Sequence, residues 1–242
     1  MIVAAAREIR DGEVVFVGMR LPITAYGVAR LTHAPNAVGL FESGVVRYQP
    51  AKGMLYTMGD NANQLGAAWT SGLIEVMSHL QRGRVDAGFI GGAEIDRYGN
   101  INTSYIGDYR RPATKLPGSG GAADIAALSK RTLAIMNHEK RRLVERVDYI
   151  TSPGYLTGGN SRREAGLAGG PAAVITDRAV LRPFGPDNEL HLSTLHPGQS
   201  LDDVRRHTGW NLQLSPDSGD TPLPSKDELS ALHAIDRDGF WR

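Results

Sequence analysis

Short apolar runs of strand length alternate with amphipathic segments of helix length along this chain, and this rhythm constrains the fold more than any other feature. The runs include EVVFVGM (13–19), AVGLFE (37–42) and AAVITD (172–177). Alternation of this kind is typical of α/β domains with a largely parallel sheet. We therefore expect an α/β fold with a single open, largely parallel sheet flanked by helices, and one domain over residues 1–242.

Local patterns predict several further elements. Apolar residues between 62 and 80 recur at spacings of three and four, which indicates a helix lying on a sheet. Ser200 with Asp203, and Ser225 with Glu228, have the spacing of helix N-caps, and the second pair is a true capping box. The other expected segments are helices at 2–10 and 23–31, strands at 85–96, 132–136 and 147–151, and a turn-rich connector at 215–224.

The composition excludes some functional classes. Basic and acidic residues nearly balance, at 27 and 26, so no basic field favours a nucleic acid or a membrane surface as partner. The chain has no cysteine, which excludes disulfides and thiolate metal ligands and fits a reducing compartment. It shows neither a signal peptide nor an apolar run of the roughly 20 residues that span a bilayer. We expect a cytoplasmic protein without nucleic-acid or membrane partners.

Many of the 29 glycines cluster in short knots between the apolar runs. The segment GSGGAAD (118–124) loosely fits a dinucleotide fingerprint, but no clear strand precedes it and no acid follows at the required distance. A second interpretation is a loop whose N–H groups hold an oxyanion or a carboxylate at a helix start. A third is a plain turn and helix cap.

Two other kinds of catalytic site fail on spacing. His138 and Glu139 begin a zincin-like pattern, but position 142 holds arginine where the second histidine would be needed. We expect His138 to mark a strand end that leaves the core for a solvated basic segment, and no metal site. No G-x-S-x-G elbow is present to anchor a hydrolase triad.

A carboxylate, Glu42, stands at the end of the expected strand 37–42, directly before Ser43 and Gly44. Such a residue is either a surface carboxylate where the strand emerges, or a nucleophile. A carboxylate attacks an acyl carbon well only when it is held in place and the oxyanion that forms meets positioned N–H donors. Gly44 beside it would let a bulky thioester approach.

Four segments together resemble one family. They are LFESG (40–44), FIGGAEIDRYGNINTSYIGDYRRP (89–112), GSGGAADIA (118–126) and HEKRRLVERVDYITSPGY (138–155). The likeness is to the β subunit of class I coenzyme A transferases, and most closely to glutaconate CoA-transferase. It runs from about residue 11 to about residue 209, and the long middle segment is its most specific part.

The resemblance implies a mechanism and a set of site residues. Glu42 would attack the acyl-CoA and become a glutamyl-CoA thioester, and Gly121 would supply an oxyanion-hole N–H. The remaining expected substrate-binding residues are Gly44, Gly118, Ser119 and Gly120. The family also implies an α subunit as partner in a heterotetramer or larger assembly, with an acyl-CoA and a small carboxylic acid as substrates. Coenzyme A would enter as a substrate, and no other cofactor is implied.

One departure from the family pattern concerns Glu94, where relatives often have glutamine. This acid would either repel a dicarboxylate substrate or point outward. Relatives with the same fold are decarboxylases or hydrolases of CoA thioesters, and fold alone does not fix function. These activities, and a non-catalytic partner subunit, are the alternatives to CoA transfer.

Overall fold

The computed structural model describes residues 1–241. Contacts within the chain define two compact units. The N-terminal unit comprises residues 2–89 with the C-terminal segment that begins at Leu223, and the central unit comprises residues 90–222 with Met1. The single domain expected over residues 1–242 stays a prediction.

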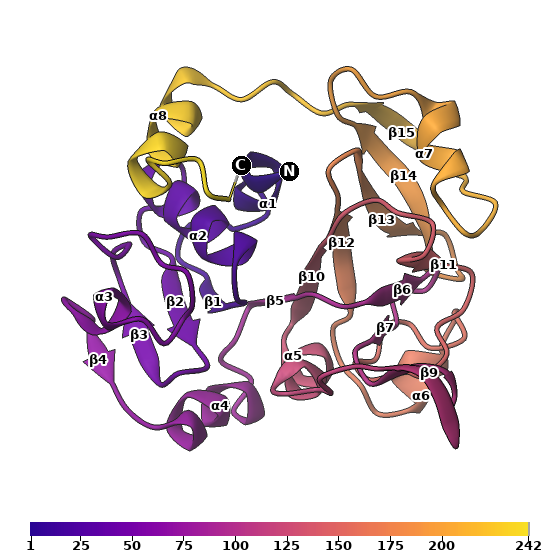
Figure 1. Cartoon of the computed structure of the whole chain (residues 1–242), viewed down its shortest axis with the longest axis horizontal. Coiled ribbons are helices and arrows are strands. Elements are labelled where there is room, and N and C mark those ends of the chain that lie inside the picture. Colours follow the sequence, from indigo (N-terminus) through magenta and orange to yellow (C-terminus); the bar gives the residue numbers. More distant parts are fainter. Residues whose placement is uncertain (242) are drawn as a thin grey trace. The chain divides into compact units, whose positions relative to one another are not determined.

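The strands of the N-terminal unit follow the spatial order β5-β1-β2-β3-β4 (Figure 1). They are β1 (Val14–Val17), β2 (Val38–Phe41), β3 (Val45–Arg47), β4 (Trp69–Thr70) and β5 (Ala87–Ile90). β1 pairs in parallel with β2 and β5, whereas β3 and β4 are added antiparallel. The β-branched run of β1 suits a central strand, whose two faces are both covered, and Val15, Phe16 and Val17 are buried.

Helices of the N-terminal unit pack around α2 (Leu21–Leu31). Both α1 (Ile2–Ala6) and α8 (Lys226–Ile235) contact it. Gly27 explains how α8 comes so close, because a Cβ at this position would lie 2.8 Å from Cδ1 of Ile235. Both expected serine caps are present, and Ser225 and Glu228 form the complete capping box at the start of α8.

The helix expected over 62–80 is wrong. The segment forms α3 (Asn61–Gln64), strand β4 and α4 (Leu73–Gln81) instead. Gly66 interrupts the helical path with a positive φ of 70°, a conformation that favours glycine. Of the residues in α4, Val76 and Leu80 are buried whereas Ile74 is 79% exposed, so the apolar repeat does not lie on a sheet over its whole length.

The large sheet of the central unit follows the order β10-β12-β13-β14-β15 (Figure 1). Its strands are β10 (Arg131–Ile135), β12 (Pro171–Ile175), β13 (Ala179–Phe184), β14 (Glu189–Leu195) and β15 (Leu214–Asp220). β10 and β12 are parallel, β12 to β14 are antiparallel, and β15 is parallel to β14. The connector expected at 215–224 is therefore wrong in its first half, which is a strand.

Smaller elements complete the central unit. A short sheet of β11 (Leu143–Val144), β6 (Glu94–Asp96) and β7 (Ile101–Asn102) accompanies the hairpin of β8 (Tyr105–Asp108) and β9 (Arg111–Lys115). The helices are α5 (Ala122–Leu128), α6 (Ser161–Glu164) and α7 (Leu201–Arg206). Residues 147–151, expected as a strand, are irregular, and the strand expected at 85–96 is two strands, β5 and β6.

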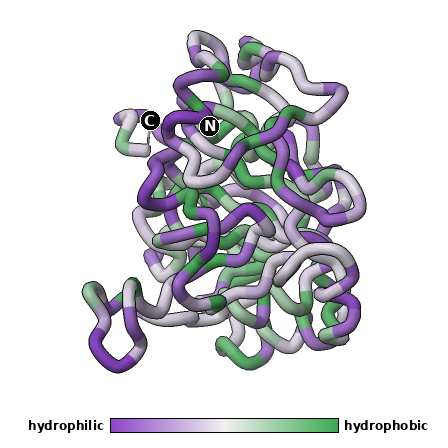
Figure 2. The backbone as a smooth tube through the Cα atoms, turned by 90° about the vertical axis from the view of Figure 1, so that its right-hand side faces the viewer, coloured by the Kyte–Doolittle hydropathy of each residue, from purple (hydrophilic) through white to green (hydrophobic). Residues whose placement is uncertain are grey.

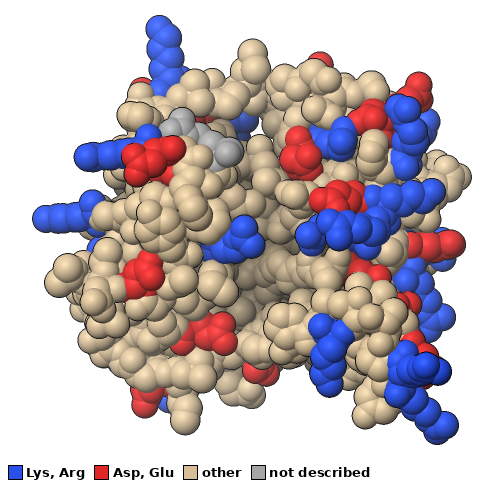
Figure 3. All heavy atoms as spheres, in the orientation of Figure 1, with Lys and Arg blue, Asp and Glu red and all other residues tan. Residues whose placement is uncertain are grey.

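The α/β class with an open sheet flanked by helices is confirmed, with parallel strands at its core and antiparallel additions. Hydrophobic and hydrophilic stretches alternate along the backbone, as expected for elements that bury one face (Figure 2). Side chains of both charge signs are intermixed on the face in Figure 3. No helix within residues 1–241 combines the length and the apolar character that crossing a bilayer requires.

Candidate active site

Glu42 lies on a tight turn that joins β2 to β3. Phe41 faces Val45 across the hairpin, which leaves a three-residue loop of Glu42, Ser43 and Gly44. The amide of Gly44 donates to the carbonyl of Phe41 at 2.9 Å, and Gly44 has a φ of 93°. This is the form in which a turn is followed by a residue of positive φ. It places Glu42 directly at the carboxyl end of β2, where α/β sheets bind ligands.

The turn is held from two directions. On one side, the amide of Ser71 donates to the carbonyl of Gly44 at 2.8 Å. A Cβ at Gly44 would collide with the Ser71 carbonyl, so glycine is required there for packing as well as for its φ. On the other side, the Ser43 hydroxyl donates to the carbonyl of Met58 at 2.9 Å. Glu42 between them is half-buried, and the approach of a thioester at the buried Gly44 stays a prediction.

The loop of residues 118–121 lies in the central unit and precedes α5. Gly118 and Gly120 have positive φ angles of 98° and 49°. The amide of Gly118 donates to the carbonyl of Thr103 at 2.7 Å, which ties the loop to the end of β7. The Ser119 hydroxyl accepts from the amide of Ala123, and Gly121 is the buried residue that precedes the helix.

The structure bears on the three interpretations of this loop. The strand before it, β9, belongs to an antiparallel hairpin and not to a parallel βαβ unit, which contradicts the dinucleotide fingerprint. Ser119 does cap the first turn of the helix, as the plain turn-and-cap interpretation expects. The binding roles of Gly118, Ser119, Gly120 and Gly121 stay predictions.

Glu94 does not point outward. It lies on β6, is 6% exposed and accepts a hydrogen bond of 2.8 Å from the side-chain amide of Asn102 on β7. Asn102 in turn donates to the carbonyl of Tyr105 and accepts from the amide of Ser104. The carboxylate therefore anchors the turn between β7 and β8 and is engaged within the protein.

His138 does not emerge into a solvated segment, as the sequence suggested. It is 1% exposed, and its two ring nitrogens lie 3.0 Å and 2.9 Å from the hydroxyls of Thr176 and Thr208. Burial lowers the pKa of His138 to about 4, so the imidazole is neutral. Among residues 1–241 no group of histidine and carboxylate side chains is arranged to hold a metal ion.

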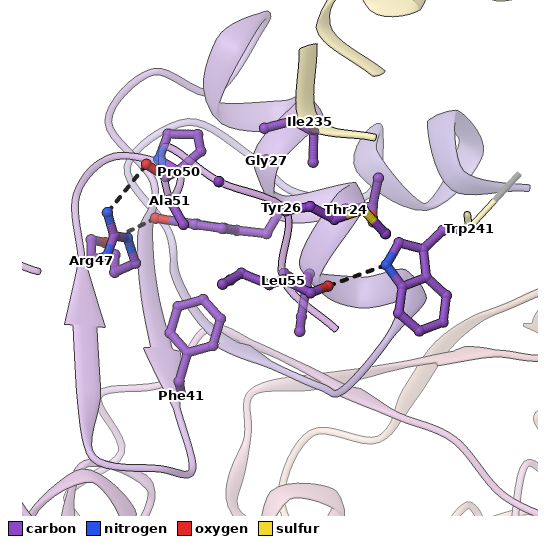
Figure 4. Close-up of a pocket in the computed structure, with 13 residues that line it drawn as sticks. Thr24, Tyr26, Gly27, Phe41, Arg47, Pro50, Ala51, Leu55, Ile235 and Trp241 are labelled. Carbon is purple, nitrogen blue, oxygen red and sulfur yellow. Dashed lines mark hydrogen bonds between the residues drawn. The ribbon is translucent and has the colours of Figure 1, made fainter. Parts of the chain in front are cut away.

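Sequence reasoning missed Arg47, which ends β3 and is 2% exposed. It borders a small cavity of about 20 Å³ in the N-terminal unit, with Tyr26 and Phe41 among the other lining residues (Figure 4). The Tyr26 hydroxyl donates to the carbonyl of Arg47 at 2.8 Å, and burial raises the pKa of Tyr26 to about 12. The only signal in the sequence is an arginine that closes the apolar run VVR.

At the other end of the cavity, the indole of Trp241 donates to the carbonyl of Leu55 at 3.2 Å (Figure 4). Arg20 stacks over the Trp241 ring, with its guanidinium carbon 5.3 Å from the ring centroid. The last described residue thus holds the loop that covers the cavity.

Comparisons with known proteins agree over nearly the whole chain. A family model described as coenzyme A transferase matches residues 1–207. The β subunit of the 3-oxoadipate CoA-transferase of Pseudomonas knackmussii is 41% identical over 238 residues, which are 98% of this chain and 91% of the relative. The corresponding subunit of the glutaconate CoA-transferase of Acidaminococcus fermentans is 37% identical over 220 residues, 88% of this chain and 82% of the relative.

Solved structures agree with the sequence matches. The crystal structure of the Acidaminococcus fermentans glutaconate CoA-transferase matches 100% of this chain and 95% of that chain, with a TM-score of 0.91 and 31% identity. The decarboxylase AibA/AibB matches 99% of this chain and 94% of that chain, with a TM-score of 0.86 and 29% identity. The resemblance found in the sequence is confirmed: this chain belongs to the coenzyme A transferase family, as a member of its β-subunit type.

Proposed function

We propose that this chain is the β subunit of a class I CoA transferase that moves coenzyme A from an acyl-CoA to a carboxylate through Glu42. The observation that carries the proposal is the placement of this carboxylate on a closed three-residue turn at the end of β2. A nucleophile held by its backbone loses little freedom when it reacts, and such positioning lowers the barrier. Membership of the coenzyme A transferase family supports the same chemistry.

The reaction balances without any redox partner. A carboxylate oxygen of Glu42 attacks the thioester carbon, a C–O bond forms, the C–S bond breaks and the CoA thiolate leaves. The thiolate then attacks the Glu42 carbonyl of this mixed anhydride, which releases the donor acid and leaves a glutamyl-CoA thioester. The acceptor carboxylate repeats the sequence in reverse order, so that CoA departs on the acceptor and the Glu42 carboxylate is regenerated. Coenzyme A is a substrate here, and the proposal requires no other cofactor.

Each addition creates an oxyanion, and we assign its stabilisation to the loop of residues 118–121. Backbone N–H groups that face the developing charge are worth several kcal/mol in such reactions, about 3 to 4 per donor. Gly121 is the proposed donor. Gly118, Ser119 and Gly120 are the proposed contacts to the substrate, since their positive φ angles and helix cap fix the loop backbone.

The substrates we propose are the CoA esters and free acids of short dicarboxylic acids. Both relatives with high identity are named for such acids, 3-oxoadipate and glutaconate. Each of those relatives is one subunit of a two-subunit enzyme, so we propose an α subunit as the partner in a hetero-oligomer, a heterotetramer in the simplest case. A cytoplasmic location stays a prediction.

A second candidate, a CoA-thioester decarboxylase or hydrolase, is favoured by the match to the decarboxylase AibA/AibB. In a hydrolase, water rather than a carboxylate would attack the anhydride or thioester, and exclusion of water decides between the two outcomes. A third candidate is a non-catalytic subunit that completes the site of its partner. The three differ in what happens to Glu42.

The test uses the complex of this chain with its α subunit, incubated with 3-oxoadipyl-CoA or glutaconyl-CoA and no acceptor. We expect a CoA-sized mass increase on this chain, mapped to Glu42 after borohydride reduction. Glu42→Ala should abolish the adduct, and Glu42→Asp should slow its formation about a hundredfold, because the shorter arm displaces the attacking oxygen by about an ångström. An unmodified chain together with released CO2 or free CoA would instead support the decarboxylase or hydrolase.

A further inference from the structure

Arg47 spends its charge on backbone carbonyls. Its guanidinium donates to four of them, and within residues 1–241 no carboxylate forms a salt bridge with it. The acceptors are the carbonyls of Gln49, Pro50, Asn63 and Leu65. A buried cation without an anionic partner is costly unless such dipoles surround it. The side chain therefore serves to gather the two ends of the loop formed by residues 48–66.

A continuous chain of hydrogen bonds leads from Arg47 to the turn that carries Glu42. Asn63, whose carbonyl accepts from Arg47, is 0% exposed and donates its side-chain amide to the carbonyl of Met58 at 2.7 Å. The same Met58 carbonyl accepts from the hydroxyl of Ser43, the neighbour of Glu42. Met58 is thus the point at which the loop of residues 48–66 meets the turn.

We propose that Arg47 is a positioning residue for Glu42: by closing the loop of residues 48–66 it fixes the Met58 carbonyl that holds Ser43 and so the attacking carboxylate. This inference rests on the proposed role of Glu42 as nucleophile. Lysine cannot replace arginine here, because one ammonium donates from a single point whereas the planar guanidinium spans four carbonyls.

The chain provides a matched control. Arg162 in the central unit is 3% exposed and likewise donates only to backbone carbonyls, including those of Ala126, Pro153 and Ala168. Arg162→Lys therefore removes the same kind of buried hub, with the same change of side chain. It has no hydrogen bond to the loop of residues 48–66.

The experiment compares Arg47→Lys, Ser43→Ala, the double variant and Arg162→Lys, each in complex with the α subunit. Hydrogen exchange of the amides in residues 48–66 reports the loop, and the rate of CoA adduct formation with 3-oxoadipyl-CoA reports Glu42. In Arg47→Lys we expect exchange at least about tenfold faster in this loop, and adduct formation about a hundredfold slower with little change in the half-saturating acyl-CoA concentration. Arg162→Lys should leave exchange of residues 48–66 unchanged.

Ser43→Ala should slow adduct formation while the loop keeps its protection. The double variant should lose less than the product of the two single losses, because both act through Met58. Wild-type exchange in Arg47→Lys, or faster exchange with a wild-type rate of adduct formation, would overturn the proposal. If Arg47→Lys does not fold, a wild-type rate in Ser43→Ala would overturn it equally. If the wild-type complex forms no adduct, the proposed function has failed, and this result is distinct because the exchange comparison does not depend on it.

Discussion

The buried imidazole of His138 makes the stability of this protein depend on pH. Both of its ring nitrogens face threonine hydroxyls, and its pKa is lowered by burial, with nearby Arg178 and His207 adding to the lowering and Asp177 opposing it. In the unfolded chain the same imidazole titrates near 6.5. Between pH 6.5 and about 4 the unfolded state therefore binds more protons than the folded state.

The sign and size of the effect follow from this difference. The contribution is fully present above pH 6.5 and is lost progressively as the pH falls towards 4. At about 1.36 kcal/mol per pKa unit, the loss in the free energy of unfolding amounts to about 3 kcal/mol. This is a large share of the 5–15 kcal/mol that is typical of a folded domain, given roughly.

The assay is urea unfolding, followed by circular dichroism, between about pH 7.5 and about pH 4.5. His138→Gln should lower the free energy of unfolding at neutral pH and should flatten its decline with acid by about 3 kcal/mol relative to wild type. His233→Gln, at an exposed position of α8, is the control and should follow the wild-type curve. If His138→Gln declines as steeply as wild type, the assignment of this pH dependence to His138 is refuted.

Two further predictions concern local geometry and the α8 cap. Gly44→Ala should lower the free energy of unfolding by at least about 2 kcal/mol and abolish adduct formation at Glu42, because a Cβ collides with the Ser71 carbonyl at an unfavourable φ; an unfolding curve like that of wild type would contradict it. Arg7 donates two hydrogen bonds of 2.7 Å to Glu228 and lowers the pKa of this carboxyl to about 2. Glu228→Gln should therefore cost about 3 kcal/mol at neutral pH, and the difference from wild type should fade between pH 4.5 and about 2, as measured by urea unfolding at each pH; a difference that persists at the acid end would show that the charge is not its origin.

Features that depend on near neighbours in the sequence were predictable. The capping box of Ser225 and Glu228 needs only a spacing of three residues, and the strand–turn pattern around Glu42 needs only the run of residues 38–46. The segment of residues 62–80 failed because its apolar spacing suits a helix, whereas Gly66 adopts a positive φ that a helix does not contain. Residues 147–151 failed because β-branched composition does not supply a partner strand.

The sequence alone determined the α/β class, the family and the carboxylate at the end of β2, because these depend on local composition and on a pattern of residues read in order. Only the tertiary structure decided that Gly44 is required by the Ser71 carbonyl, that Glu94 and His138 are buried among hydrogen-bond partners, and that Arg47 closes a loop. The physical reason is that a buried polar group is satisfied by whichever donors and acceptors folding brings to it. For Arg47 and His138 these come from up to 18 and 70 residues away along the chain, at separations that local propensity does not encode.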